Sequence, residues 1–462
     1  MEVPPLVLDR ASATPLPVQV AAGLRDAASS GVLAAGDRLP STRELAALLR
    51  VSRTVTAAAY DQLLAEGWVQ GRRGVGTFVV DVPVGAPRRA GAAAAAPASP
   101  GPRPPSAVDL RAGTPCLEVL ETAAWRRAWR AAGDRPPDVG ADPLGDPAFR
   151  AAVVTHLLRH RGLPADPADV LATSGTSVAV AEVAATLPPG ARVAVEDPGY
   201  RRSTGALRAA GCDVAAVPVD ADGLVVDAVP AGVAAVLCTP AHQFPLGGRL
   251  PAARRARLVG RARAEGFLVL EDDYDGELRY DVAPLPLLAA LAPDVVVHLG
   301  TTSKTVSPTL GAGWMVCPPA VRDAVLERRT VTGTRPPRAG QRVLAAMAES
   351  GDLSRHLRRL RRELGARRDL VRAAVLRAGL EPVGDAAGAH LVVPLVSRAA
   401  EERVVVAAQE RGVLVSGLAE SCVDAPARGG TAGVVVGWAA PRRPELAAAL
   451  GVLTRALTTA HR

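Results

Sequence analysis

One residue type is nearly absent from this chain, and its single occurrence is a side chain suited to covalent chemistry. Lys304 is the only lysine among 54 lysine and arginine residues. Arginine serves for surface charge and ion pairs, but its guanidinium stays protonated and cannot form a Schiff base. A lysine amine can attack a carbonyl carbon. Composition alone leaves two explanations open for Lys304, which are such chemistry and the chance survival of one lysine.

Acidic and aromatic side chains precede Lys304, each after a short apolar run that predicts a buried strand. Alone, an acidic residue such as Asp272 usually caps a strand end or is solvated. The segment from Gly300 to Thr305 resembles the lysine motif of fold-type I aminotransferases, and Asp272 and Tyr274 resemble their Asp and Tyr pair. The resemblance implies that Lys304 binds pyridoxal 5′-phosphate (PLP), with Asp272 opposite the pyridine nitrogen and Tyr274 at the phenolic oxygen. Thr301 is expected among the cofactor-binding residues.

Three further segments resemble the pocket of the same family. Ser174, Gly175 and Thr176 join an expected strand to an expected helix, where backbone N–H groups suit a phosphate, although an ordinary helix cap has the same pattern. Tyr200 ends an E-D-P-G-Y element whose tyrosine stacks on the cofactor ring in that family; alone it would more often be a core residue. His242 lies in a T-P-x-H-Q-F-P segment. A lone histidine is usually structural, and we assign it no catalytic role.

Two positions depart from the aminotransferase pattern. Gly311 stands where the family commonly has an arginine that holds the phosphate, which predicts weaker PLP binding or a substitute arginine. No arginine lies near Val435, where true aminotransferases hold the substrate carboxylate, and this argues against efficient transamination of α-amino acids. Arg202 is a candidate effector contact for a carboxylate. A plain surface arginine explains Arg202 equally well.

The elements near the N-terminus have the pattern of a DNA-binding head. Ser41 and Glu44 form a capping box at the start of one expected helix, and Ser52 caps the next. A glycine-rich turn and a strand at 77–80 complete a winged helix-turn-helix. Residues 14–80 resemble the GntR-type winged helix. The resemblance implies DNA contacts by Arg43, Ser52, Arg53, Thr54, Arg72, Arg73 and Gly74.

General physical chemistry agrees with these DNA contacts. Helix N-termini and hydroxyl groups suit phosphates, and arginine can read guanine or enter a narrow minor groove. The alternatives are a surface ion pair for Arg43 and a solvated turn for Arg72 and Arg73.

The order of these elements predicts three parts. Residues 1–80 form the winged helix-turn-helix, and residues 81–106, rich in proline and alanine, form a linker. Residues 107–462 alternate apolar strands with helices, which predicts an α/β body with a largely parallel sheet and a smaller C-terminal subdomain. The resemblance of its motifs to aminotransferases implies that this body is of the PLP-dependent transferase type (fold type I).

Composition limits the cellular compartment and the kinds of partner that we expect for the protein. The formal net charge of +8 permits an acidic partner such as nucleic acid. No apolar run approaches the roughly 20 residues that a membrane span needs, and the first residues do not resemble a signal peptide. The five cysteines are far apart and show no metal-ligand spacing. We therefore expect a cytoplasmic protein without a metal site.

A GntR-type head, a linker and an aminotransferase-like body together resemble the MocR/GabR regulators. The resemblance implies a homodimer that binds a double-stranded DNA operator, and a body that senses an amine, an amino acid or PLP itself. Two alternatives stay open. The protein is an active PLP-dependent aminotransferase, or its body has lost PLP and serves as a dimer scaffold.

Overall fold

The structure is a computed structural model that describes residues 6, 8–12, 14–72, 75–80, 107–136, 142–280, 286–424 and 432–461. The chain divides into two compact units, Met1–Pro102 and Arg103–Arg462, and each is described by itself. The expected linker at 81–106 and the wing residues Arg73 and Gly74 lie outside the described residues. Within the described ranges, no helix is long and apolar enough to cross a bilayer.

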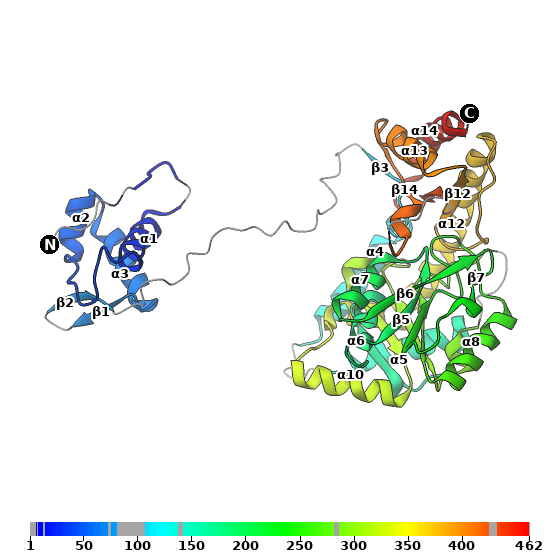
Figure 1. Ribbon diagram of the computed structural model, residues 1–462, viewed down its shortest axis with the longest axis horizontal. Helices are drawn as coiled ribbons and strands as arrows, with labels where there is room; N and C mark the ends of the chain where they lie inside the picture. The colour runs from blue at the N-terminus through cyan, green and yellow to red at the C-terminus, as the bar shows by residue number, and fades with distance from the viewer. Residues whose placement is uncertain are drawn as a thin grey trace. The chain divides into compact units, whose positions relative to one another are not determined.

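The N-terminal unit is a three-helix head with a small β-wing (Figure 1). Its elements are α1 (Leu16–Ser29), α2 (Thr42–Leu49), α3 (Arg53–Ala65), β1 (Val69–Arg72) and β2 (Gly76–Val79). The two strands pair antiparallel. Leu24, Leu45 and Leu63, one from each helix, are buried together in the core of the head. The predicted winged helix-turn-helix is confirmed.

Side-chain caps fix where the second and third helices begin. Ser41 Oγ accepts a hydrogen bond from the Glu44 backbone N–H at 3.3 Å, and the Ser41 N–H donates to Glu44 Oε2 at 2.7 Å. Ser52 Oγ accepts from the Val55 N–H at 3.4 Å. These bonds satisfy N–H groups that a helix cannot pair internally, so the predicted capping box and the Ser52 cap fix the starts of α2 and α3.

The body is built on an eight-stranded mixed sheet (Figure 1). Its strands, in spatial order, are β4 (Val170–Thr173), β11 (Gly313–Val316), β10 (Val296–Thr301), β9 (Leu268–Asp273), β8 (Ala235–Cys238), β5 (Arg192–Asp197), β6 (Asp213–Asp220) and β7 (Gly223–Leu224). The run from β10 to β6 is parallel, whereas β11 is antiparallel to both of its neighbours. The central strands, such as β8 and β10, are short segments buried on both faces, as expected for a sheet between helices, whereas β6 near the edge alternates buried with exposed residues.

Helices cover both faces of this sheet. Alternate strand residues enter two separate cores, because successive side chains of a strand point to opposite faces. One core includes α5 (Pro147–Arg161), α8 (Ala252–Glu265) and α11 (Arg338–Glu349). The other includes α6 (Thr176–Ala184), α7 (Arg201–Ala209) and α10 (Pro319–Thr332). The remaining helices here are α4 (Thr122–Gly133) and α9 (Leu288–Leu291), with 3₁₀ turns at Leu117–Val119, Pro167–Asp169, Val226–Ala228 and Pro308–Leu310.

The last part of the chain forms the smaller subdomain that the sequence predicted. An antiparallel sheet of β12 (His390–Leu395), β15 (Ala432–Gly437) and β14 (Ser416–Gly417) packs with α12 (Asp352–Arg377), α13 (Arg398–Gln409) and α14 (Arg443–His461). A parallel pair of β13 (Val413–Leu414) and β3 (Val108–Asp109) ties the start of the body to this subdomain, and a 3₁₀ turn spans Leu418–Ser421.

Candidate cofactor site and DNA-contacting residues

A cavity of about 500 Å³ lies where β4, β9 and β10 end. The three strands run in the same direction, so their carboxyl ends meet at one edge of the sheet, the usual ligand position in an α/β fold. Every residue predicted for the cofactor or effector lines this cavity, namely Ser174, Gly175, Thr176, Tyr200, Arg202, Asp272, Tyr274, Thr301 and Lys304. Thr301 is the last residue of β10, which extends further than the predicted apolar run.

Lys304 is held in a partly buried position within the cavity. Its Nζ donates a hydrogen bond to the Gly113 carbonyl at 2.7 Å and lies 5.9 Å from the centroid of the Tyr200 ring. Gly113 has φ of +103°, and a Cβ there would come within 3.2 Å of Nζ, so glycine permits this close approach. Burial, and then the charge of Arg202, lower the pKa of the Lys304 amine. A lowered pKa increases the neutral, nucleophilic fraction of the amine.

Asp272 has a free acceptor directed into buried space. Its side chain is 3% exposed, and Oδ1 has no hydrogen-bond partner among the described residues. Burial and the charge of Asp273 raise the pKa of Asp272 to about 7, opposed by Lys304 and a hydrogen bond with Thr176. An unpaired buried carboxylate oxygen is costly. A protonated pyridine nitrogen would supply the missing donor, so this residue fits PLP.

The acidic run around Asp272 is buried, contrary to the usual solvated position of such runs. Glu271 accepts hydrogen bonds from two backbone N–H groups of α9, at 2.7 and 3.1 Å. Asp273 forms a two-point ion pair with Arg161 at 2.6 and 2.8 Å, and the Arg161 side chain is fully buried. Each neighbour of Asp272 therefore has its own partner, and these contacts fix the end of β9.

The expected phosphate end of the cavity offers backbone donors but few cations. Gly175, with φ of +130°, precedes the first turn of α6, where free N–H groups suit a phosphate. The Thr301 hydroxyl accepts from the Ser303 N–H at 3.1 Å. Gly311 is in the left-handed region at φ +54° and does not line the cavity. Among the described residues, Lys304 and Arg202 are the cationic side chains that do.

The structure also places the position where an aminotransferase would hold the substrate carboxylate. Val435 lies in β15 and is buried in a small apolar cluster with Val392 and Leu418. It does not line the cavity. Arg202 does, so within the described residues it is the arginine available to an anionic effector.

The predicted DNA-contacting residues that the structure describes, which leave out Arg73 and Gly74, are exposed. Arg43 lies in the first turn of α2, and Ser52, Arg53 and Thr54 lie at the start of α3. Arg72 extends over the Phe78 ring at 4.8 Å. In the described part of the head, none of these three arginines forms an ion pair, so the ion-pair alternative for Arg43 finds no support.

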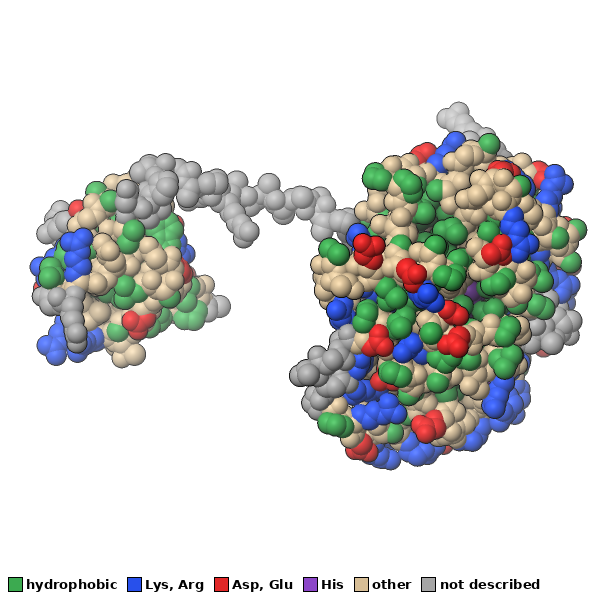
Figure 2. Space-filling model, turned by 90° about the horizontal axis from the view of Figure 1, so that it is seen from below, with side chains coloured by type: hydrophobic (Ala, Val, Ile, Leu, Met, Phe, Trp, Pro, Cys, Tyr) green, Lys and Arg blue, Asp and Glu red, His purple; other side chains and the backbone are tan. Residues whose placement is uncertain are grey.

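Basic side chains on the body are not gathered into one patch on the face that Figure 2 shows. Figure 2 shows them scattered among acidic ones on the face in view. The argument for DNA binding therefore rests on positions in the head and not on overall charge. Arg38, which sequence reasoning missed, approaches the wing: a Cβ on Gly76 would lie 2.8 Å from its Nε.

Several residues of the cavity escaped sequence reasoning, among them Gly113 and His390. Phe244 and Ser303 also line it. Both lie in segments that resemble the pocket of the family, although neither was predicted individually as a site residue. Gly113 and His390 lie far from the other motifs in the sequence, so only folding reveals them.

Comparisons with known proteins agree with this architecture. The aminotransferase class I and II family matches residues 106–429, and the family of bacterial regulatory proteins of the gntR type matches residues 16–79. The chain resembles the solved structures of an archaeal alanine:glyoxylate aminotransferase (22% identity, TM-score 0.70, covering 76% of this chain and 90% of that one) and of LysN, an α-aminoadipate aminotransferase from Thermus thermophilus (24%, 0.69, 77% and 93%). These likenesses confirm the predicted fold.

Two curated relatives extend over both units. The pyridoxine biosynthesis transcriptional regulator PdxR of Corynebacterium glutamicum is 34% identical over 422 residues, covering 90% of each chain. The probable rhizopine catabolism regulatory protein MocR of Rhizobium meliloti is 31% identical over 461 residues, covering 94% of this chain and 92% of its own. The chain therefore belongs to the MocR/GabR family of transcription regulators, in which a GntR-type winged helix precedes an aminotransferase-like body.

Proposed function

We propose that this regulator binds PLP at Lys304 and that PLP itself is the effector that sets its affinity for DNA. The observation that supports this most directly is the pairing, in one cavity, of the only lysine amine with the unpartnered Asp272 oxygen. When bound, PLP supplies an aldehyde carbon that condenses with a primary amine. Lys304 would hold that carbon, Asp272 the ring nitrogen, and the start of α6 the phosphate.

Two departures from the aminotransferase pattern favour sensing of PLP over turnover. With Gly311 in place of the arginine, phosphate loses a charge-assisted contact, and weaker binding lets occupancy follow the free PLP concentration. The apolar surroundings of Val435 offer no anchor for an amino-acid carboxylate. A relative named for pyridoxine biosynthesis is consistent with such a signal.

A second candidate effector is an amine that carries a carboxylate. Arg202 supports it, because this guanidinium lines the cavity with Lys304 and contributes to the lowered pKa of the lysine. Such an amine would compete with Lys304 for the same carbon of PLP. This candidate predicts that DNA affinity changes only when amine and PLP are both present.

The proposed function is tested by measuring affinity for an operator selected from random duplexes, with and without PLP. We expect the affinity to change with PLP alone. Gly311→Arg should shift the response to roughly 30-fold lower PLP, because a charge-assisted contact to the phosphate is worth about 2 kcal/mol. The roughly 1 kcal/mol cost of a side chain in the left-handed region is the same with and without PLP, so it lowers the stability of the fold and not the affinity for PLP. Gly311→Ala, with the same backbone cost and no cation, is the matched control and should give no gain. An operator affinity that is the same at zero and saturating PLP would exclude PLP as the effector.

We further propose that the protein acts as a homodimer in the cytoplasm. Winged-helix regulators commonly read two half-sites related by the symmetry of a dimer, and the five cysteines are free, as a reducing compartment requires. Sedimentation of the full chain at micromolar concentration should give twice the monomer mass. A monomer that still binds its operator with full affinity would contradict this.

A further inference from the structure

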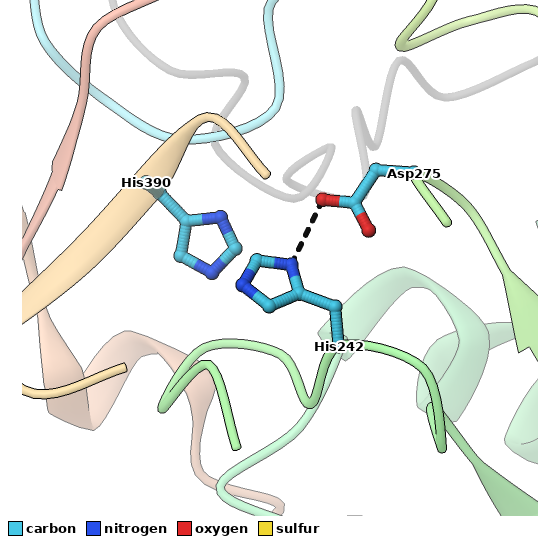
Figure 3. Close-up of side chains that lie close together, drawn as sticks. All are labelled: His242, Asp275 and His390. Atoms are coloured by element: carbon cyan, nitrogen blue, oxygen red, sulfur yellow. Dashed lines mark hydrogen bonds and ion pairs between the residues drawn. The ribbon is translucent and has the colours of Figure 1, made fainter. Parts of the chain in front are cut away.

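We propose that His242 and His390, with Asp275 hydrogen-bonded behind His242, form a binding site for a divalent transition metal ion, for which Zn²⁺ is the best match. One nitrogen of each histidine and one carboxylate oxygen of Asp275 lie within 4.8 Å of one another. The residues come from three separate segments: the loop after β8, the loop after β9 and the first position of β12 (Figure 3). The sequence predicted no metal site, because Asp275 is 33 positions after His242 and His390 is 115 positions after Asp275.

Hydrogen bonding fixes the tautomer of His242. Its Nδ1 lies 2.9 Å from Asp275 Oδ2, and a carboxylate can only accept, so Nδ1 carries the hydrogen (Figure 3). The Tyr274 hydroxyl lies 3.0 Å from both the His242 carbonyl oxygen and His242 Nδ1. Its hydrogen goes to the carbonyl, which can only accept, so its oxygen can share the Nδ1 hydrogen with Asp275. The lone pair of the His242 ring is therefore on Nε2, which is buried and has no partner among the described residues.

His390 is in the same tautomer, with its hydrogen on Nδ1 and its lone pair on Nε2, because of a different hydrogen bond. It hydrogen-bonds to the backbone at Pro245, whose carbonyl can only accept. Its Nε2 is buried and unpartnered within the described structure, so the donor is Nδ1. The ring centroids of His390 and His242 are 4.9 Å apart. Two imidazole lone pairs are thus buried close together without a donor, which is unfavourable unless something electron-poor binds them.

This arrangement is the one that metal-binding histidines adopt. A ligating imidazole usually donates its other N–H to a carboxylate or a backbone carbonyl, which fixes the ring and increases the basicity of the free nitrogen. Here Asp275 serves His242 in this way, and the Pro245 carbonyl serves His390. The carboxylate also supplies counter-charge for a divalent ion.

Glycines shape the space around the histidine rings. A Cβ on Gly388 would come within 2.6 Å of both His242 Nδ1 and Asp275 Oδ2, and one on Gly247 would lie 3.4 Å from His242 Nε2. Any larger residue at Gly388 would displace the cluster. His390 and Asp275 also line the large cavity, so an ion and its completing water molecules have a route from that side.

Ligand chemistry selects the class of ion. Imidazole nitrogen suits Zn²⁺ and the later first-row metals, at bond lengths of about 2.0–2.1 Å for zinc, whereas Mg²⁺ prefers oxygen and keeps its water. Two nitrogen ligands leave coordination positions open toward the cavity. The Tyr274 hydroxyl is hydrogen-bonded to the His242 backbone. An ion bound to the His242 ring would fix the position of His242 and, through this bond, that of Tyr274.

The test uses the full-length chain without PLP. The protein is stripped with chelator, incubated with Zn²⁺ or Mg²⁺, and freed of unbound ion by gel filtration, and its metal content is measured. We expect about one Zn²⁺ per chain and no Mg²⁺. His390→Gln should lose the zinc, whereas His298→Gln, which changes another fully buried histidine outside the cluster, should keep it.

A second measurement guards against a variant that does not fold. Co²⁺ in place of zinc should give the visible absorption of a low-coordinate nitrogen-ligated ion in the wild-type chain, and Asp275→Asn should weaken it. The proposal is overturned if wild type retains no more zinc than His390→Gln, if His298→Gln loses it equally, or if Co²⁺ shows only the spectrum of the hydrated ion.

Discussion

Lys304→Ala is expected to abolish covalent binding of PLP completely. No other ε-amino group exists in the chain, so no side chain can replace it. The wild-type chain mixed with PLP should develop a visible absorption band, and borohydride reduction should fix the cofactor on the peptide that contains Lys304. The variant should show neither the band nor the modified peptide.

Lys304→Arg is the informative control, because it keeps the charge and the length of the side chain. Arginine stays protonated and cannot condense with the aldehyde, so this variant should lose the band as completely as Lys304→Ala. Both variants retain Asp272 and the start of α6, and weak noncovalent binding of PLP is expected in both. A band of wild-type intensity in either variant would show that the α-amino group, or no amine, holds the cofactor.

The effect of Lys304 on DNA binding separates sensing from scaffolding. If PLP is the effector, both variants should bind the operator as the PLP-free wild type does, and added PLP should change little. An unchanged PLP response in Lys304→Ala would mean that occupancy of the cavity, and not the covalent link, carries the signal.

Local motifs were the part of this molecule that the sequence revealed best. The Ser41 capping box and the turn at Gly175 depend on residues close together in the chain, and the structure forms both as expected. Lys304 and Ser174 follow strands and Asp272 is the next-to-last residue of one, and parallel strands bring their carboxyl ends together. The convergence of these motifs on one cavity therefore followed from the fold class.

Contacts between distant segments could not be predicted in this way. The sequence gives no pairing between Arg161 and Asp273, and an acidic run is ordinarily solvated. The same holds for His242 and His390, whose meeting requires β12 to approach the loop after β8. Whether each of these buried polar groups has a partner depends on which segments the fold brings together. The sequence pattern alone does not contain this information.

The second large effect concerns the head, where Arg43 and Arg53 are expected to carry much of the specific DNA affinity. Both are exposed at the starts of α2 and α3 and form no ion pair in the described part of the chain. A bidentate contact from arginine to guanine is worth about 1–3 kcal/mol, so Arg53→Ala alone should weaken operator binding by roughly 5- to 150-fold. The double variant Arg43→Ala/Arg53→Ala should weaken it further.

Arg25 provides the matched control for this prediction. It lies in α1 of the same head but is paired with Glu66 at 2.8 Å. Arg25→Ala removes the same charge, so its effect on operator affinity measures the loss of general electrostatic attraction alone, and we expect it to be small. Two further measurements then distinguish the roles of Arg43 and Arg53. Removing an arginine that contacts phosphate lowers the slope of affinity against salt concentration by about one. Removing an arginine that contacts a base weakens the preference for the operator sequence over other sequences. Equal operator affinity in wild type and the double variant would show that DNA is bound through another surface.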